Sequence, residues 1–173
     1  VPADRDGRVR AFDDLFREHY RAVQAYVASR FPEADSAAIM STTFEVAWRR
    51  FDDLPAAAAR GWLIGVARNC ARNELRADRR RRHHLGVLEA AARHRPAELS
   101  ADAVVTSGTV DALRAAFERL SEADREVLLL AEWDGLTGAD LGAALGVRAN
   151  VAAVRLHRAR ARLRAAFLEG GAS

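Results

Sequence analysis

Apolar residues recur every three or four positions along most of this 173-residue chain, a spacing that predicts α-helices. In the first third, the pattern predicts a helix from about Ala11 to Arg30, which Pro32 ends because proline cannot continue a helix. A second helix is predicted to begin at Asp35 or Ser36, since either residue is a good N-cap. Its broad apolar face is expected to be buried on more than one side. That face comprises Ile39, Thr43, Val46 and Ala47, with Met40, Phe44, Trp48 and Phe51 beside them.

A third helical pattern runs from about Gly61 toward Arg81, after an irregular stretch at 51–60. Its inward-facing positions are Trp62, Leu63, Val66, Ala67, Cys70 and Ala71. We interpret Trp48 and Trp62 as core residues rather than platforms for stacked bases. Cys70 lies on the apolar side and is interpreted as a small packed thiol.

The last third of the chain has the pattern of a helix-turn-helix, a unit that lays its second helix in the major groove of DNA. A helix over Val110–Leu120 precedes a capping box from Ser121 to Asp124, and Thr137 with Asp140 repeats the signal. Gly146 supplies a left-handed exit from the short helix that follows. The long last helix, Val151 to Leu168, is expected to pack through Val151, Val154, Leu156, Ala159, Leu163 and Phe167, with Trp133 in the core at the preceding turn.

Residues 85–108 show no clean period and contain Pro96, so they predict a linker, with room for a short helix at Leu85–Arg95. The predicted fold is therefore all-α. It consists of two small helical domains, at 8–84 and 109–170, joined by that linker, and the second domain is the helix-turn-helix.

The positive charge is unevenly distributed. All 27 basic residues are arginine, yet the net charge is only +3. Five arginines fall between 155 and 164 with no acid among them, and Arg68, Arg72, Arg76 and Arg79 form a stripe at steps of three and four. Two basic patches on a nearly neutral chain predict two contacts with a polyanion. The run 79–82 fits a solvated helix end as well as a specific contact.

Other chemistry has little support in the sequence. There is no nucleophile motif and no phosphate-cradling glycine loop, so we expect no enzyme, no small-molecule substrate and no cofactor. The His83-His84 pair has no third ligand nearby, so we expect a surface pair and no metal. Cys70 is the only cysteine, and the longest aliphatic run, Val127 to Ala131, is too short for a bilayer. We therefore expect a cytoplasmic protein without membrane insertion.

Separate segments in the two halves resemble one protein family. In the first half they are 48–51 (WRRF) and 61–69 (GWLIGVARN); in the second they are 121–130, 133–137 and 155–163. In order and spacing they resemble the RNA polymerase sigma factors, and among these the extracytoplasmic-function group. The resemblance covers nearly the whole chain except the linker. It implies a protein that binds core RNA polymerase and brings it to promoter DNA to start transcription.

The resemblance also implies how the DNA contacts are divided. The N-terminal domain of the family contacts the −10 element and captures an unstacked base, where stacking and backbone arginines supply affinity. The loop 54–60 would sense that base. The residues implied on this side are Arg60, Arg68, Asn69, Arg72, Asn73, Arg76, Arg79 and Arg80.

The C-terminal domain of the family places its long helix in the major groove of the −35 element. The residues implied on this side are Arg148, Asn150, Arg155, His157, Arg158, Arg160 and Arg162. The first three are candidates for base contacts, and the last three arginines are expected to hold phosphates, which position without specifying. Two features depart from the family: Arg148-Ala149 stands where a Ser or Thr usually caps this helix, and Ala153 replaces a usual basic residue.

The second helix is implied to contact polymerase, through Asp35, Ile39, Met40, Phe44, Glu45 and Trp48. Family members usually carry an acidic pair in this helix where the present chain has Ala37-Ala38, and then Gln-Glu where it has Ser41-Thr42. Asp35 and Glu45 remain nearby, and Ile39, Met40 and Phe44 are expected to supply apolar contacts.

Three functions remain open from the sequence. The first is a promoter-specificity subunit, with core RNA polymerase, promoter DNA and an anti-sigma factor as partners. The second is a sigma-like decoy that has lost polymerase binding and sequesters an anti-sigma factor; the missing acids favour it. The third is an ordinary helix-turn-helix regulator, which the segment 61–69 argues against. Intact arginine stripes on both domains favour the first, because a decoy has no need for DNA contacts.

Overall fold

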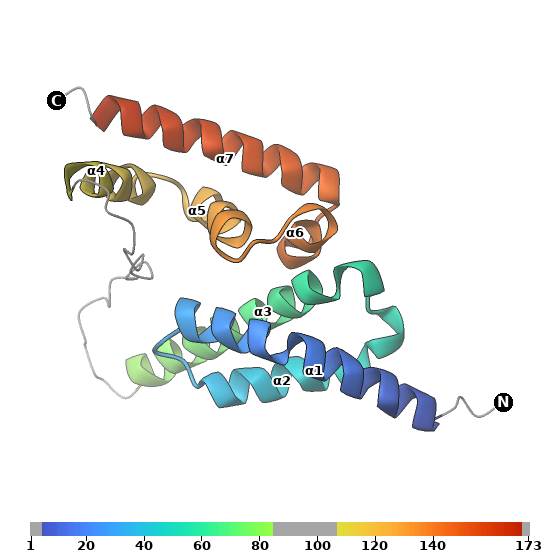
Figure 1. Ribbon diagram of the computed structural model, residues 1–173. Helices are drawn as coiled ribbons and strands as arrows, with labels where there is room; N and C mark the ends of the chain where they lie inside the picture. Colours follow the sequence, from blue (N-terminus) through green and yellow to red (C-terminus); the bar gives the residue numbers. More distant parts are fainter. Residues whose placement is uncertain (1–4, 85–106, 171–173) are drawn as a thin grey trace. The chain divides into compact units, whose positions relative to one another are not determined.

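The computed structural model describes residues 5–84 and 107–170, and the chain divides into two compact units, Val1–Glu98 and Leu99–Ser173 (Figure 1). Over the described ranges all regular structure is helical, which confirms the all-α prediction. Residues 85–106, which make up most of the predicted linker, lie outside the described residues.

Unit 1 contains three long helices, α1 (Arg5–Arg30), α2 (Ser36–Arg49) and α3 (Ala59–His84), each packed on the other two. Two short 3-10 turns, η1 (Phe51–Asp53) and η2 (Ala56–Ala58), connect α2 to α3 within the stretch predicted as irregular. α1 begins before the predicted position because polar residues extend it ahead of the apolar pattern. Of the two predicted N-caps, Asp35 is the one that caps α2: its carboxylate accepts a hydrogen bond of 3.1 Å from the Ala38 N–H.

The core of unit 1 is small and aliphatic. Its members that are at most 1% exposed are Val23 and Val27 from α1, Ile39, Thr43 and Ala47 from α2, and Leu63, Ile64, Ala67 and Ala71 from α3. Thr43 is the polar member, and its hydroxyl donates to the Ile39 carbonyl at 2.7 Å. A buried hydroxyl that is satisfied in this way adds little cost to the core.

Two tryptophans of unit 1 lie at its edge. Trp48 was predicted to be core, but 37% of it is exposed; its ring meets Phe12 edge-on and the Arg8 guanidinium lies 5.0 Å from its centroid. Trp62 is half-buried, and the Arg50 guanidinium lies 5.7 Å from its ring centroid. Each indole therefore lies at the edge of the unit beside an arginine.

Unit 2 contains α4 (Ser107–Glu118), α5 (Glu122–Leu128), α6 (Gly138–Leu145) and α7 (Ala149–Gly170), with a π-helical turn, η3 (Leu129–Trp133), after α5. α4, α5 and α6 all pack against α7, which is therefore the common support of the unit (Figure 1). The fully buried positions of α7 are Ala152 and Ala159. The prediction that Val151 and Val154 pack inward is wrong: they are 39% and 49% exposed, because the buried stripe runs through Ala152 instead.

The predicted caps of unit 2 have mixed outcomes. Ser121 caps α5, accepting from the Asp124 N–H at 3.1 Å, and Gly146 ends α6 in the left-handed region at φ 68°, both as predicted. Thr137 occupies the N-cap position of α6, but its side chain makes no capping hydrogen bond, so the second predicted box is wrong. Trp133 was predicted to be core and is 49% exposed, since the wider π-helical turn breaks the period on which that prediction depended.

The joint between α6 and α7 is a close backbone contact. A Cβ on Gly142 would lie 2.8 Å from the Val147 carbonyl oxygen and 3.0 Å from the Ala149 nitrogen, which is too close for any side chain. Gly142 is buried, and its carbonyl accepts from the Val147 N–H at 2.9 Å. Glycine at this position therefore lets α6 pack directly against the turn that leads into α7.

Candidate nucleic-acid interface

The leading end of α7 is polar, basic and exposed. Arg148, Asn150, Arg155, His157 and Arg158 are all exposed. Among the described residues, no ion pair reaches Arg148, Arg155 or Arg158. No described acid therefore balances their charge, which is available to an anion.

The start of α7 is capped without the expected Ser or Thr. The Arg148 carbonyl accepts the first helical hydrogen bond, from the Ala152 N–H at 3.0 Å. The Asn150 Oδ1 accepts from the Val151 N–H at 2.9 Å, which satisfies one of the first-turn donors that no helical carbonyl can reach.

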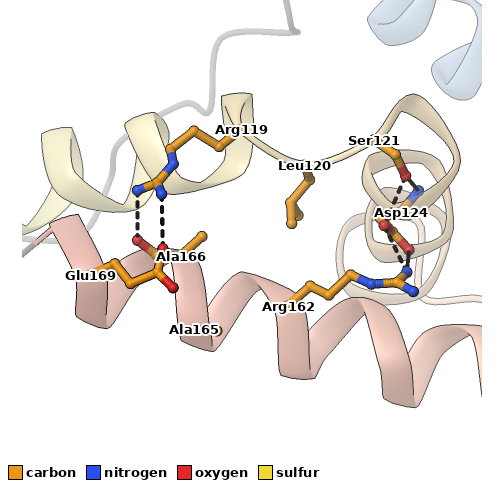
Figure 2. Close-up of a pocket in the computed structure, with 8 residues that line it drawn as sticks. All are labelled: Arg119, Leu120, Ser121, Asp124, Arg162, Ala165, Ala166 and Glu169. Atoms are coloured by element: carbon orange, nitrogen blue, oxygen red, sulfur yellow. Dashed lines mark hydrogen bonds and ion pairs between the residues drawn. The ribbon is translucent and has the colours of Figure 1, made fainter.

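Further along α7, two arginines implied to hold phosphates are engaged inside unit 2. The Arg160 Nε donates to Glu132 at 2.7 Å. The Arg162 Nη1 donates to both carboxylate oxygens of Asp124, at 2.7 and 2.9 Å, and the side chain of Asp124 is only 13% exposed (Figure 2). Arg162 thus ties α7 to the capped start of α5.

A groove of about 560 Å³ surrounds this contact, between the α4–α5 turn and the C-terminal half of α7 (Figure 2). At its other end Arg119 pairs with Glu169 at 2.8 Å and donates to the Ala166 carbonyl at 3.3 Å. Both arginines of the groove are therefore neutralised by carboxylates of the same unit. Its lining residues are Arg119, Leu120, Ser121, Asp124, Arg162, Ala165, Ala166 and Glu169.

The arginine stripe of unit 1 lies along α3. Asn69, Asn73 and Arg76 are exposed on the side of α3 opposite Leu63, Ala67 and Ala71, as their spacing requires. Arg79 and Arg80 continue the exposed surface toward the end of the helix. Arg60, Arg68 and Arg72 are half-buried, and each takes part in a contact within the chain. The structure thus gathers five of the eight residues implied on the −10 side on exposed helix surface.

The residues implied to contact polymerase are divided between surface and core. Ile39, Met40 and Phe44 are 1%, 5% and 7% exposed, so their side chains pack inside unit 1 and are not available to a partner in the folded protein. The exposed side of α2 instead presents Ala37, Ala38, Ser41 and Thr42, which are neutral. Three further residues complete that side: Asp35, Glu45 and the partly exposed Trp48. Glu45 forms an ion pair with Arg49.

The remaining chemistry of the described residues is limited. Burial raises the pKa of the Cys70 thiol, and its hydrogen bond with Thr43 opposes that shift, so the thiol is neutral at pH 7. No group of three His, Cys, Asp or Glu side chains within 5–84 and 107–170 is placed to hold a metal ion. Among the described helices, none combines the length and the apolarity needed to cross a membrane.

Comparison with known sequences gives one family match and several relatives. The family described as "Sigma-70, region 4" matches residues 110–163. The RNA polymerase sigma factor NccH of Alcaligenes xylosoxydans xylosoxydans is 33% identical over 164 residues, covering 90% of this chain and 86% of that protein. The RNA polymerase sigma factor CnrH of Cupriavidus metallidurans is 31% identical over 168 residues, 92% of this chain and 87% of that protein. The sigma factor CarQ of Myxococcus xanthus is 28% identical over similar coverage.

Two solved structures resemble the fold. One contains CnrH in complex with the cytosolic domain of CnrY; it is 25% identical, with a TM-score of 0.51, over 90% of this chain and 86% of that one. The other contains the sigma factor RpoE of Bartonella quintana in complex with the anti-sigma factor NepR, at 22% identity and a TM-score of 0.56, over 91% and 97% of the two chains.

Proposed function

This chain belongs to the RNA polymerase sigma factors, in the extracytoplasmic-function group, and we propose that it divides promoter recognition between two surfaces. The exposed face of α3 in unit 1 binds the −10 element. The leading end of α7 in unit 2 enters the major groove of the −35 element. Core RNA polymerase is the partner that carries both units to the promoter.

The observation that carries this division is the set of unpaired arginines on α7. Arg148, Arg155 and Arg158 are exposed and no described acid neutralises them, whereas Arg160 and Arg162 are held by Glu132 and Asp124. A recognition helix reads bases with its N-terminal residues, and Arg148 and Arg155 lie at that end of α7. Arg164, which is also exposed and has no described acid partner, lies far from that end. Arg148, Asn150 and Arg155 are therefore the candidates for base edges, and Arg158 and His157 for the backbone.

The α3 face supports a different mode of contact. Asn69, Asn73 and Arg76 provide a polar strip that follows one side of the helix, suited to a strand whose bases have left the stack. Half-buried Arg68 and Arg72 flank it, with stems supported by the fold. Asn73→Ala combined with Arg76→Ala should reduce promoter melting, measured by permanganate reactivity of unpaired thymines. The control is Arg17→Ala, an exposed arginine of α1, which should leave melting unchanged.

Polymerase docking is proposed to use the exposed side of α2 with little electrostatic help. Ala37→Glu combined with Ala38→Asp restores the acids that the family usually carries, at two exposed positions that are not part of the hydrophobic core. Because exposed ion pairs contribute up to about 1 kcal/mol each, affinity for core RNA polymerase should rise by roughly three- to tenfold. Unchanged or weaker binding would show that α2 does not meet the polymerase as it does in the family.

An anti-sigma factor is a further proposed partner. Two related sigma factors have been solved as complexes, one of them with a protein named as an anti-sigma factor. The neutral side of α2 keeps a second function open, that of a decoy which sequesters an anti-sigma factor without binding polymerase. The unpaired arginines of α7 argue for the first function, because sequestration needs no DNA-binding charge.

The deciding experiment is co-elution of the full chain with core RNA polymerase, followed by run-off transcription on a genomic promoter library. Stable binding with promoter-dependent transcripts supports the proposed function. Failure to bind by a folded chain that does bind an anti-sigma factor would favour the decoy.

A further inference from the structure

Two valines on the leading end of α7 lie outside the buried stripe of that helix. Val151 is 39% exposed and Val154 is 49% exposed, while the buried stripe of the same helix runs through Ala152 and Ala159. They occupy the first two turns of α7, which begins at Ala149. These are the turns from which a recognition helix reaches base edges.

Val154 lies in the middle of the basic surface. On a helix, a residue's surface neighbours are those three and four positions away. For Val154 these are Asn150, Val151, His157 and Arg158, and all four are exposed. The two valines therefore form an apolar spot bordered by the groups proposed to bind DNA.

Helix formation does not explain these side chains. Valine is a weaker helix former than alanine, because its branched Cβ loses rotamer freedom against the preceding turn. Alanine occupies the neighbouring exposed positions Ala149, Ala153 and Ala161. Valine at 151 and 154 thus costs helix propensity and exposes apolar surface in the free protein, so a benefit is expected in a complex.

The chemistry of the major groove supplies a ligand that fits. Thymine is marked there by its 5-methyl group, the one apolar feature in the pattern of donors and acceptors, and it is read by apolar side chains. We propose that Val154, with Val151 beside it, contacts thymine methyl groups of the −35 element and is a specificity-determining residue of this protein. The proposal rests on the function proposed above and adds the base that this part of α7 selects.

The test removes the methyl group alone. Holoenzyme is formed from the full chain and core RNA polymerase on a promoter from the run-off library, and each thymine of its −35 region is replaced in turn by deoxyuridine. Burial of one methyl contributes about 0.8 kcal/mol, so promoter affinity should fall about fourfold at one or two of these positions. Val154→Ala should bind the thymine and uracil promoters equally at the position it contacts.

A matched control is available on the same helix. Leu168, near the end of α7, is 65% exposed, so Leu168→Ala removes a comparable exposed aliphatic group away from the proposed surface. This variant should retain the fourfold discrimination of the unmodified chain. Because Val154 is half exposed, its substitution should leave the melting temperature of the protein nearly unchanged, which thermal unfolding checks.

The outcomes separate this proposal from the one it rests on. Equal binding of thymine and uracil promoters at every position, by a holoenzyme that transcribes normally, overturns the valine contact and leaves the sigma function intact. Discrimination that persists in Val154→Ala, tested also with Val151→Ala, assigns the methyl to another residue and likewise overturns it. Loss of polymerase or anti-sigma binding in Val154→Ala, without any effect of uracil, would identify a protein contact instead. Failure of the chain to form any promoter complex removes the proposed function itself.

Discussion

The two halves of α7 carry the same residue type in different states. In the leading half, Arg155 and Arg158 are exposed and no described acid neutralises them. In the trailing half, Arg160 and Arg162 are held by Glu132 and Asp124, whereas Arg164 is exposed and has no described acid partner. Only two positions separate Arg158 from Arg160, yet one is available to a polyanion and the other is already paired.

The difference comes from acids far away in the sequence. Glu132 lies 28 residues before Arg160, and Asp124 lies 38 residues before Arg162. Asp124 belongs to α5, which packs against α7, and Glu132 belongs to the π-helical turn that follows α5. A run of arginines is therefore not one binding surface: packing partners decide which members stabilise the fold and which remain available to DNA.

The largest expected effect is a loss of stability on removing the acid that pairs with Arg162 in the trailing half of α7. Asp124→Ala removes a nearly buried carboxylate that accepts from Arg162 twice and from the Ser121 hydroxyl at 2.8 Å. Hydrogen bonds to a charged group contribute about 1.5–3 kcal/mol, and Arg162 is partly solvated, so unit 2 should lose about 2 kcal/mol. Hydrogen exchange of the α5 and α7 amides in the full chain should then accelerate roughly 30-fold. Glu118→Ala, at an exposed carboxylate of α4, is the control, and equal exchange rates in the two variants would contradict the structural role.

A smaller effect is expected on DNA binding by the leading half. Arg155→Ala with Arg158→Ala should weaken promoter binding roughly tenfold. The dependence of log affinity on log salt should flatten by about 0.9 for each lost phosphate contact. Arg160→Ala alone should leave that slope unchanged, because its charge is already paired within the unit. A slope that falls equally in the Arg160 variant would mean that the ion pair opens on DNA, and the contrast between the two halves would disappear.

The smallest expected effect comes from converting Arg160 from a paired arginine into one that is available to DNA. Glu132→Ala removes the partner of Arg160 at a site where both side chains are more than half exposed, so stability should change by less than about 1 kcal/mol. The released guanidinium should add up to about 0.9 to the salt slope of promoter binding. Restoring the original slope with the double variant Glu132→Ala and Arg160→Ala would attribute the gain to Arg160. No change in slope in the single variant would place Arg160 out of reach of the backbone.

Local signals in the sequence predicted most of the helical framework. Asp35 and Ser121 cap the helices they were expected to cap, and Gly146 takes the left-handed conformation that ends α6. Each of these features depends on a few neighbouring residues, so the sequence alone contains the necessary information.

Features that depend on tertiary packing were harder to predict. The exposure of Trp133 follows from a π-helical turn, which changes the helical period. Val151 and Val154 were expected to pack inward, whereas the fully buried positions of α7 are Ala152 and Ala159. The pairing of Arg160 and Arg162 requires knowing which acids the fold brings near. Ala152 and Ala159 are seven positions apart, so they lie on one face of α7, and both valines lie outside that face.

The close backbone contact at Gly142 has a consequence for engineering. That contact is made by backbone atoms on the buried side of the joint, so we expect the angle between α6 and α7 to be insensitive to the solvent-facing side chains of the first two turns of α7. Those positions can be substituted together while the backbone of the helix-turn-helix that presents them stays constant. Variants of this chain that differ only at such positions can then serve as mutually orthogonal switches, each addressing its own synthetic promoter, provided that Gly142 is left untouched.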